Sequence, residues 1–571
     1  MDPVSRPLPV DEVGAEYFVD ERDVLHTGEQ LPPTYTDCHV TPLIDGAEYT
    51  AALRQALDLV GGGPTAQHNA GHLVLLAGWW LGLAGGALRT VQGPVRRRLG
   101  IADAVLCDGP PFCLDPWPGT GAVPFADPPD QASALLKILA TKARAGVDVR
   151  VLGWVSPNAT HGRLAKLVGA GHVIAVNGLT IRSVLRLRTV PTIGPKAVLN
   201  TVGHSVGACH SKVALVCDGQ SCVAFTGGMD LEFGRWARLG HAGDEIWHDV
   251  VARVEGPAVQ SIYDHFQELW EENLTRPPVT YRIDGVPVAS RVSGTPPLPA
   301  RVLPIAPANS RHQAQGLQTL PAARFRRLRI GPKSRPLRMA PNGLFTYRTA
   351  LRKAILMAHR YVYIEDPLHW SQEVMTWLNH AVDSRPELRV IMLLSGVDDP
   401  NDPPLPHAAY RGHAVNHGLL AGLTQHQRSR VAAFRREGVV VHAKTVLVDD
   451  AWAVIGSCNI ARRSLYTDIE HGLSFCDNEG ELVRDYRDRL WAHHFRHDNP
   501  ADFHCLAEAL HAWSPEWGRP GKPPPRPPWL LPLALPLQEV PFGRRRRWLH
   551  ASLHECDSRR PWNGLTASTH G

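Results

Sequence analysis

The sequence predicts an α/β fold built from two similar halves. Helical and strand patterns alternate along the 571-residue chain, which is typical of layered α/β proteins. Hydrophobic residues make up 44% of the chain, enough for sizeable cores. A short pattern of reactive residues also occurs twice, at His210 and 232 residues later at His442. These observations predict an internal duplication with a period too long for a solenoid.

The first half is predicted to span residues 36–274, after an irregular leader at residues 1–35. Apolar residues at helical spacing predict helices over residues 47–60, 131–146 and 258–273. Apolar runs predict strands at LVLLAGWWL, GVDVRVLGWV and HDVVARVEG. Trp79 and Trp80 end the first of these strands, where they would line either a pocket or the core.

Residues 275–340 are rich in Pro, Arg and Gly and predict a connector with some β structure. The second half, residues 341–511, repeats the order helix, strand, helix, strand in TYRTALRKAILMAHR, YVYIED, SQEVMTWLNHAVD and LRVIMLLSG. The segments GVVVHAKTVLVDD and AWAVIGSCNI follow. Residues 512–571 are a Pro-rich basic tail, which we expect to be extended or loosely packed.

Composition sets limits on the class of protein. The formal net charge of +5 neither requires nor excludes a membrane surface or a nucleic acid as partner. The ten cysteines form no CxxC pair, so we expect mostly reduced, buried thiols and no structural zinc site. The N-terminal residues lack the pattern of a signal peptide, and the apolar segment 72–88 is short for a membrane span. The predicted location is cytoplasmic or peripheral to a membrane.

The repeated pattern is one of phosphoryl chemistry. His210-Ser211-Lys212 and His442-Ala443-Lys444 each precede an apolar strand that runs toward an acidic residue. Each is followed by a turn of small residues, Gly227-Gly228-Met229-Asp230 and Gly456-Ser457-Cys458-Asn459. Two such sets meeting in one cleft would supply a nucleophile, an acid and cations for the oxygens of a phosphodiester.

The segment HAKTVLVDDAWAVIGSCN resembles the signature of the phospholipase D superfamily: H-x-K, four residues, Asp, six residues, then G-S-x-N. The first copy, HSKVALVCDGQSCVAFTGGMDLEFGRW, is similar but has Cys217 where the acid is expected, with Asp218 one residue later. It is also three residues longer between the His and the glycine pair, which a bulge or a longer hairpin would absorb. The resemblance implies two mixed-sheet halves with helices on both faces, related by a pseudo-two-fold axis, with the active site between them.

Three further segments resemble the same superfamily. Trp247-His248-Asp249 is similar to its W-H-D segment, whose acid orients the first catalytic His. Glu470 lies where the second orienting acid is expected. Residues 363–366, Y-I-E-D, resemble a segment of phospholipases D and cardiolipin synthases, although Glu365 would equally fit a solvated charge at a strand end.

The resemblance implies a two-step mechanism through a phosphohistidine, with His210 as nucleophile and His442 as acid and base. No metal ion or other cofactor is expected, because lysines supply the positive charge. The residues predicted to be catalytic are His210, Lys212, Asp249, His442, Lys444, Asn459 and Glu470. Ser457, Gly228 and Asp230 are predicted to bind the phosphate, whereas Asp218 and Asp449 are predicted to be structural turn residues.

The predicted activity is hydrolysis or transphosphatidylation of glycerophospholipids by a monomer at a membrane surface. Three alternatives stay open: a cardiolipin synthase-type phosphatidyltransferase, a nuclease, and a non-catalytic relative that binds lipid or nucleic acid. A nucleic acid partner is not expected, since superfamily nucleases are typically short chains with one motif. The basic run from Arg324 to Arg338, like Arg544–Arg547, would be either a solvated segment or a contact for anionic lipid headgroups or nucleic acid.

Overall fold

The computed structural model describes residues 14–24, 30–79, 81, 135–154, 196–204, 207–231, 235–241, 245–283, 286–291, 293–298, 303, 311–322, 336–397, 407–514, 517 and 525–537. Trp80, most of the basic run that ends at Arg338, and Arg544–Arg547 lie outside the described residues.

A single mixed sheet runs through the described part of the chain, with 15 strands in the order β19-β14-β13-β12-β16-β17-β18-β11-β1-β8-β6-β5-β2-β3-β4. On the first-half side these are β1 (Thr34–Ile44), β2 (Leu73–Gly78), β3 (Asp148–Trp154), β4 (Ala197–Asn200), β5 (Val213–Cys217), β6 (Cys222–Gly227) and β8 (Val250–Glu255). On the second-half side they are β11 (His312–Thr319), β12 (Tyr361–Glu365), β13 (Arg389–Ser395), β14 (Val431–Arg436), β16 (Thr445–Val448), β17 (Trp452–Gly456), β18 (Glu470–Asp477) and β19 (Leu530–Leu533). The prediction of an α/β fold with mixed strand directions is confirmed.

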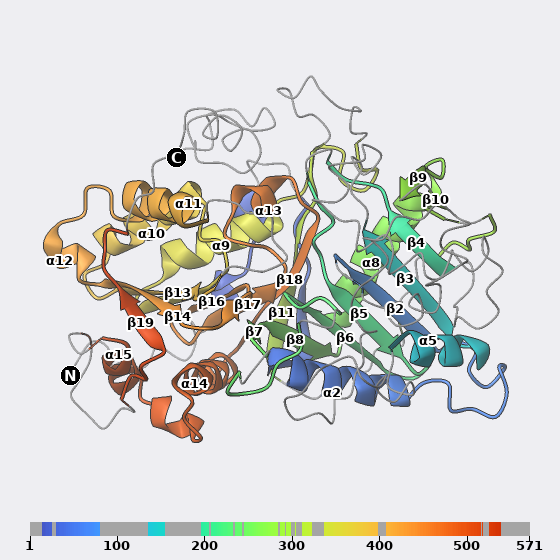
Figure 1. The fold of residues 1–571 in the computed structure, drawn as a ribbon, viewed down its shortest axis with the longest axis horizontal. Coiled ribbons are helices and arrows are strands. Elements are labelled where there is room, and N and C mark those ends of the chain that lie inside the picture. Colours follow the sequence, from blue (N-terminus) through green and yellow to red (C-terminus); the bar gives the residue numbers. More distant parts are fainter. Residues whose placement is uncertain are drawn as a thin grey trace, which may run out of the picture.

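The order of strands is the same on both sides of the central pair β1 and β11. From the centre outward, the first strand on each side comes from near the C-terminal end of its half, β8 on one side and β18 on the other. A hairpin follows, β6–β5 or β17–β16. Three strands with parallel pairing follow, β2–β3–β4 on one side and β12–β13–β14 on the other. In Figure 1 the second half lies to the left and the first half to the right, with β11, β18 and β8 between them.

Helices cover both faces of this sheet. The helices are η3 (Ala15–Tyr17), α1 (Glu21–Val24), α2 (Asp45–Asp58), α5 (Leu135–Arg144), α8 (Val259–Leu274), α9 (Thr346–Met357), α10 (Gln372–Ser384), α11 (His407–Ala414), η7 (Val415–Leu419), α12 (Gln425–Arg428), α13 (Arg462–Tyr466), α14 (Glu481–Phe495), η8 (Pro500–Phe503) and α15 (Leu506–Trp513). Helix α2 packs with α5 in one core, α9 packs with α10 in a second, and α8, α14 and α15 share a third. In Figure 1, α9 and α10 lie on one side of the strands and α14 and α15 on the other.

Apolar periodicity explains the main elements. All six residues of β2 are buried, since the strand has neighbours on both sides and cores on both faces. In α2, Tyr49, Leu53 and Leu57 recur every four residues and form its buried face. Helix α10 begins after Ser371, whose hydroxyl accepts a hydrogen bond from the backbone N–H of Val374.

The predicted leader, connector and tail each contribute to the packed structure. Tyr17 and Phe18 of the leader are buried in the core of the second half. The connector contains β11, which lies in the centre of the sheet, and the two-stranded sheet of β9 (Thr280–Ile283) and β10 (Val286–Ala289). In the tail, residues 530–533 are extended, one of the two forms expected there, and as β19 they pair with β14 at the edge of the sheet.

The structure also tests the expectations about the cysteines and about the apolar segment 72–88. Cys217 and Cys222 form a disulfide, so not every cysteine is reduced, although Cys38, Cys209, Cys458 and Cys476 are free and buried. Residues 73–78 of the apolar segment 72–88 form β2, as expected, and the segment beyond residue 81 lies outside the described residues. None of the helices formed by the described residues has the length and apolar character needed to span a bilayer.

Candidate active site

The two motif histidines are each fixed by a short parallel contact between the halves. Cys209 forms a parallel bridge with Ile469, and the backbone N–H of His210 donates to the carbonyl oxygen of Ile469 at 2.8 Å. In the same way, β7 (Trp247–His248) pairs in parallel with β15 (Val440–Val441), and the N–H of His442 donates to the carbonyl oxygen of His248 at 2.8 Å. Each histidine therefore follows, by one residue, a strand contact made with the opposite half.

This register crosses the two halves and corrects the predicted pairing of acids and histidines. Asp249 was predicted to orient His210, but its Oδ2 atom lies 2.7 Å from Nδ1 of His442. His210 is held instead by Glu470, whose two carboxylate oxygens lie 3.2 and 3.1 Å from its Nδ1. The physical reason is the register of the two parallel contacts. Because His248 pairs with Val441, Asp249 comes opposite His442. Because Ile469 pairs with Cys209, Glu470 comes opposite His210.

The motif lysines are held against the histidines that precede them. Lys212 Nζ donates to the carbonyl oxygen of His210 at 2.7 Å, and Lys444 Nζ donates in the same way to His442. Burial is the largest cause that lowers the pKa of both imidazoles, and the positive charge of both lysines lowers these pKa values further. The turn after the first motif lies against Lys444 of the second, and the turn after the second motif contacts His210 of the first, so the two motif sets lie side by side.

Burial sets the protonation of this site. Desolvation lowers the pKa of His210 and of His442 well below the usual value, so both rings are neutral at pH 7. Desolvation likewise raises the pKa of Asp249 and of Glu470 to about 7 and lowers the pKa of Lys444 to about 8. The side chains of His210 and His442 keep 7% and 10% of their surface exposed, so both rings border solvent.

Two residues predicted to bind phosphate have other partners. The Ser457 hydroxyl donates to Glu470, and its carbonyl oxygen accepts from His210 Nδ1 at 2.9 Å, so Ser457 positions the acid and the imidazole. Asp230 accepts the backbone N–H of Trp79 at 3.0 Å and lies 3.6 Å from Lys212 Nζ. A carboxylate at this point repels an anion, and Asp230 is better explained as the group that holds Lys212.

Gly228 and Asn459 occupy the two turns that follow the motif hairpins. A Cβ atom at Gly228 would collide with Oδ1 of Asp249 and lie 3.1 Å from Cδ of Lys444, so only glycine fits there. Gly228 therefore makes room for the site without contributing a side chain. The Oδ1 atom of Asn459 is buried and has no hydrogen-bond partner within the described part of the chain. This amide is one polar group that the surrounding protein leaves unsatisfied.

Asp218 and Asp449 are turn residues, in line with the structural role predicted for them. Asp218 accepts the N–H groups of Gln220 and Ser221 at 2.9 and 2.7 Å. Asp449 accepts three backbone N–H groups, of residues 359–361, and the Tyr17 hydroxyl. The three extra residues of the first motif are spread over a longer hairpin, since β5, its turn and β6 each exceed the β16–β17 hairpin by one residue. Their register shows no bulge.

Aromatic rings and an arginine border the site, and of these only Trp79 was expected to line a pocket or the core. The Trp79 ring meets His210 edge-on at 5.3 Å between centroids, so this tryptophan borders the site as well as packing on Trp154. Arg235 lies 3.4 Å above the Trp247 ring, which itself lies 4.9 Å from the His442 ring. Arg235 lies in the G-R-W letters and Trp247 in the W-H-D letters of the first half. These two resemblances could therefore have indicated that both residues lie at the site.

A second layer of buried polar residues supports the first. Glu365 is fully buried and accepts from Nε2 of His248 at 2.8 Å and Nε2 of His494 at 2.7 Å, which excludes the solvated alternative. Asp366 accepts the backbone N–H of Ile460 at 2.8 Å, and desolvation raises its pKa to about 6. Asp366 thereby fixes the loop that contains Asn459, whereas Glu365 fixes the residue next to Asp249.

Comparisons with known proteins give partial matches to this chain. The family model described as "Cardiolipin synthase, PLD-like domain" matches residues 351–493, which include the second motif and Glu470. Cardiolipin synthase A from Yersinia pseudotuberculosis is 25% identical over 270 residues, 47% of this chain and 45% of that protein. The chain therefore matches less than half the length of this curated relative.

Two solved structures are more distant. Phosphatidylserine synthase from Haemophilus influenzae has a TM-score of 0.43 and 12% identity, and the match covers 82% of this chain and 90% of the other. A phospholipase D family member from Salmonella typhimurium has a TM-score of 0.20 and 13% identity over 25% of this chain and 82% of the other. At these scores neither structure carries a conclusion about this chain. With the match over residues 351–493, however, the predicted resemblance of this chain to the phospholipase D superfamily is confirmed.

Proposed function

We propose that this protein is a phosphatidyltransferase of the cardiolipin synthase type that works through a phosphohistidine. From the sequence, phospholipase D-type hydrolysis is the leading prediction and this transfer is among the alternatives. The matched family model and the curated relative are both named for cardiolipin synthase, and they favour transfer to an alcohol over hydrolysis. The observation that carries the proposal is the crossed pair of imidazoles, each with a buried carboxylate on Nδ1.

The proposed first step is attack by His210 on phosphorus. Its Nδ1–H is bonded to Glu470 and to the carbonyl oxygen of Ser457, which leaves the lone pair on Nε2 for the attack. The Nε2–P bond forms as the bond from phosphorus to the leaving alcohol oxygen breaks, and His442 gives that oxygen a proton. The anionic diester raises the pKa of the neighbouring His442, which enables the ring to hold this proton in the complex.

The proposed second step returns the histidine to its free state. The hydroxyl of an acceptor alcohol loses its proton to His442 and attacks phosphorus, and the bond to His210 breaks. Lys212 and Lys444 would balance the charge on the non-bridging oxygens, and Asn459 would donate its amide N–H to one of them. No step in this scheme requires a metal ion.

Further features of the proposal concern the whole chain. Because both motifs occur in one chain, we propose that a monomer forms the complete site, at a membrane surface where phospholipids are available. The matching strand order on the two sides of the sheet supports a duplicated origin with a pseudo-two-fold relation. A nucleic acid is not part of the proposed function.

The test uses vesicles of phosphatidylglycerol and mass spectrometry of the products. Two molecules of phosphatidylglycerol would give one cardiolipin and one glycerol, whereas hydrolysis would give phosphatidic acid and glycerol. We expect cardiolipin from the wild type and at least a 10³-fold loss of product in His210→Ala and in His442→Ala. His504→Ala is the matched control, because His504 is a half-exposed histidine outside the site and its loss should leave the rate unchanged.

Each other product identifies a different function. Phosphatidic acid as the main product at saturating phosphatidylglycerol would favour hydrolysis. Cleavage of single-stranded DNA with no lipid product would establish a nuclease. Vesicle or DNA binding without any product from either would leave the non-catalytic relative, and the transferase proposal would then be abandoned.

A further inference from the structure

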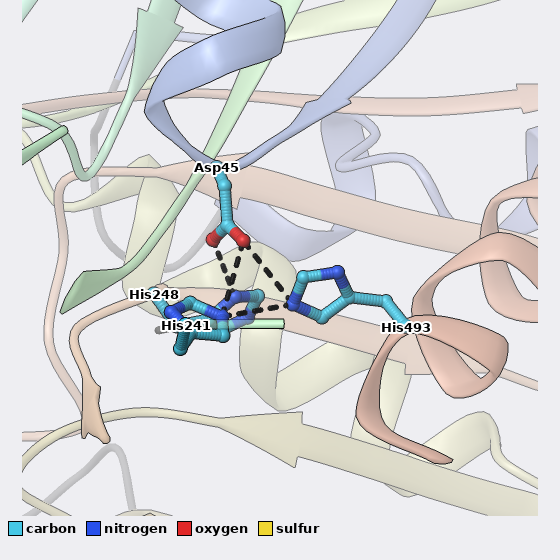
Figure 2. Close-up of side chains that lie close together, drawn as sticks. All are labelled: Asp45, His241, His248 and His493. Atoms are coloured by element: carbon cyan, nitrogen blue, oxygen red, sulfur yellow. Dashed lines mark hydrogen bonds and ion pairs between the residues drawn. The ribbon is translucent and has the colours of Figure 1, made fainter. Parts of the chain in front are cut away.

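A cluster of buried histidines lies behind Asp249, outside the set of groups that the proposed reaction uses. Asp45 begins α2, His241 precedes β7, His248 ends β7, and His493 lies near the end of α14. All four residues are buried. Figure 2 shows the Asp45 carboxylate pointing toward the three imidazole rings, with His493 reaching in from α14 at the right.

Three atoms of the cluster are arranged as metal ligands are. Nε2 of His241 and Nε2 of His493 are 3.1 Å apart, and each lies 3.2 Å from Oδ2 of Asp45. A tetrahedral zinc ion with bonds of about 2.0–2.1 Å holds its ligand atoms about 3.3 Å apart. The observed triangle is thus within about 0.2 Å of the spacing that such an ion imposes.

Hydrogen bonding satisfies these three atoms only in part, because Nε2 of His493 carries at most one proton and faces both Nε2 of His241 and Oδ2 of Asp45. Nδ1 of His241 lies 3.0 Å from the carbonyl oxygen of Glu245, which can only accept, so Nδ1 carries the proton and Nε2 has a lone pair. Oδ2 of Asp45 has no hydrogen-bond partner in the part of the chain that the structure describes, although two ring nitrogens lie 3.2 Å away. A lone pair and an unsatisfied carboxylate oxygen directed to one buried point are the groups that a cation would bind.

His248 orients the cluster without being free to ligate. Its Nδ1 lies 2.7 Å from Oδ1 of Asp45, and its Nε2 lies 2.8 Å from Oε2 of Glu365. Both nitrogens face carboxylate oxygens, so both carry protons and neither has a lone pair for a metal. Glu365 also binds His494, whose Nδ1 accepts from Arg436 at 2.7 Å. Such outer contacts fix ligand carboxylates and imidazoles in metal sites.

The backbone is also held in an unusual conformation at two of the three ligands. Asp45 has a φ of 64° and His241 a φ of 48°, values that residues with a side chain rarely adopt. Left-handed residues other than glycine cost free energy and persist where the surroundings fix them. At these two positions the conformation directs the side chains to the same point as His493.

We propose that Asp45 Oδ2, His241 Nε2 and His493 Nε2 bind one divalent transition-metal ion, with zinc as the expected metal. Two imidazoles and one carboxylate suit Zn²⁺ better than Mg²⁺ or Ca²⁺, which prefer oxygen ligands. The ion would join α2 and the segment before β7 in the first half to α14 in the second. It would thereby hold β7, and with it Asp249, in place under His442. This role is structural, and it departs from the sequence prediction that no metal is present.

The test measures metal in the full-length chain, independently of activity. Protein grown with added zinc and dialysed against metal-free buffer is analysed by inductively coupled plasma mass spectrometry. We expect about one zinc ion per chain in the wild type and at least a tenfold lower content in His493→Gln, whose amide N–H can still reach Asp45 but is a poor zinc ligand. His265→Gln is the matched control, since His265 is another buried histidine outside the cluster, and its zinc content should equal that of the wild type.

A second measurement keeps the proposal testable if His493→Gln does not fold. Wild-type protein stripped with a chelator is titrated with Zn²⁺, and separately with Mg²⁺, while the melting temperature is followed. We expect a rise of several degrees that saturates near one equivalent of zinc and is absent with magnesium. The proposal is overturned by wild-type protein with less than 0.1 metal per chain and a melting temperature indifferent to zinc. Equal zinc contents in wild type and folded His493→Gln would also overturn it, because the ion would then lie elsewhere.

Discussion

The crossed pairing predicts that the two orienting acids act on different steps of the reaction. Glu470 holds His210, the proposed nucleophile, and Asp249 holds His442, the proposed acid and base. Replacing each acid by its amide removes the carboxylate with little change in volume. Glu470→Gln should therefore impair attack on phosphorus, whereas Asp249→Asn should impair proton transfer to the leaving group and from the acceptor.

The expected size follows from the contact. A hydrogen bond from a buried imidazole to a carboxylate at 2.7 Å is of the charge-assisted kind, which contributes about 1.5–3 kcal/mol. This corresponds to a loss of about 10- to 150-fold in rate. Loss of tautomer control adds to it, and the equivalent Asp→Asn change in a Ser-His-Asp triad lowers kcat about 10⁴-fold. We expect Asp249→Asn and Glu470→Gln each to lower kcat on phospholipid by about 10² to 10⁴.

A substrate with a good leaving group separates the two steps. Phosphatidyl-p-nitrophenol releases p-nitrophenolate without needing a proton, so stopped-flow absorbance reports formation of the phosphohistidine alone. Asp249→Asn should keep a burst of about one equivalent of p-nitrophenolate and then turn over slowly. Glu470→Gln should lose the burst, because His210 no longer presents Nε2 as a nucleophile.

The reverse result would refute the crossed assignment. If Glu470→Gln keeps the burst and Asp249→Asn loses it, the acids act on the other histidines or the roles of His210 and His442 are exchanged. Rate changes below threefold in both variants would show that neither carboxylate controls its imidazole. Circular dichroism of both variants serves as the control for folding.

Three further predictions concern pH, a glycine and a turn residue. The rate should rise with pH through about 7, because burial raises the pKa of Glu470 to about 7 and its carboxylate form is needed. The rate should fall above about 8, because Lys444 then loses its charge. Lys444→Arg should move this alkaline fall upward by more than two pH units in an active variant. Gly228→Ala should lower kcat at least 10²-fold by displacing Asp249, measured on protein of unchanged melting temperature. Asp449→Ala should leave kcat per folded molecule within about threefold but lower the free energy of unfolding by about 2–5 kcal/mol, because three backbone N–H groups lose their acceptor.

Each of these predictions has an outcome that contradicts it. A pH profile that is flat from 6 to 9 would show that neither Glu470 nor Lys444 limits the rate in that range. Full activity in Gly228→Ala would mean that Asp249 can move without consequence for His442. A large loss of kcat in folded Asp449→Ala would give this turn residue a direct part in the reaction.

Local pattern was sufficient to predict most elements and the motif residues. Strands β16 and β17 were expected because apolar runs flank the H-x-K and G-S-x-N letters, and both strands are buried throughout. The extra length of the first motif was identified as a hairpin or a bulge, and the register decides for the hairpin. These features depend on residues close together in the chain, where spacing alone fixes geometry.

Pairings between distant segments could not be predicted in the same way. Asp249 follows the first motif and precedes the second, and no spacing indicates which histidine it meets. The choice is made by the parallel pairing of two-residue strands β7 and β15, which are too short to have a sequence signal of their own. Strand β11 was missed as a central strand because its sequence, HQAQGLQT, has few of the apolar and β-branched residues that mark buried strands.

The same crossing explains why the two motifs belong in one folded unit. Each imidazole takes its carboxylate from the opposite half, so neither half holds an oriented histidine by itself. An isolated half would expose its lysine, its histidine and its acid beside an unpaired sheet edge, and the histidine would have no carboxylate to orient it. Formation of the site is thus coupled to the docking of the halves along β1 and β11, and we expect substitutions at that junction to affect the proposed reaction through the position of the carboxylates.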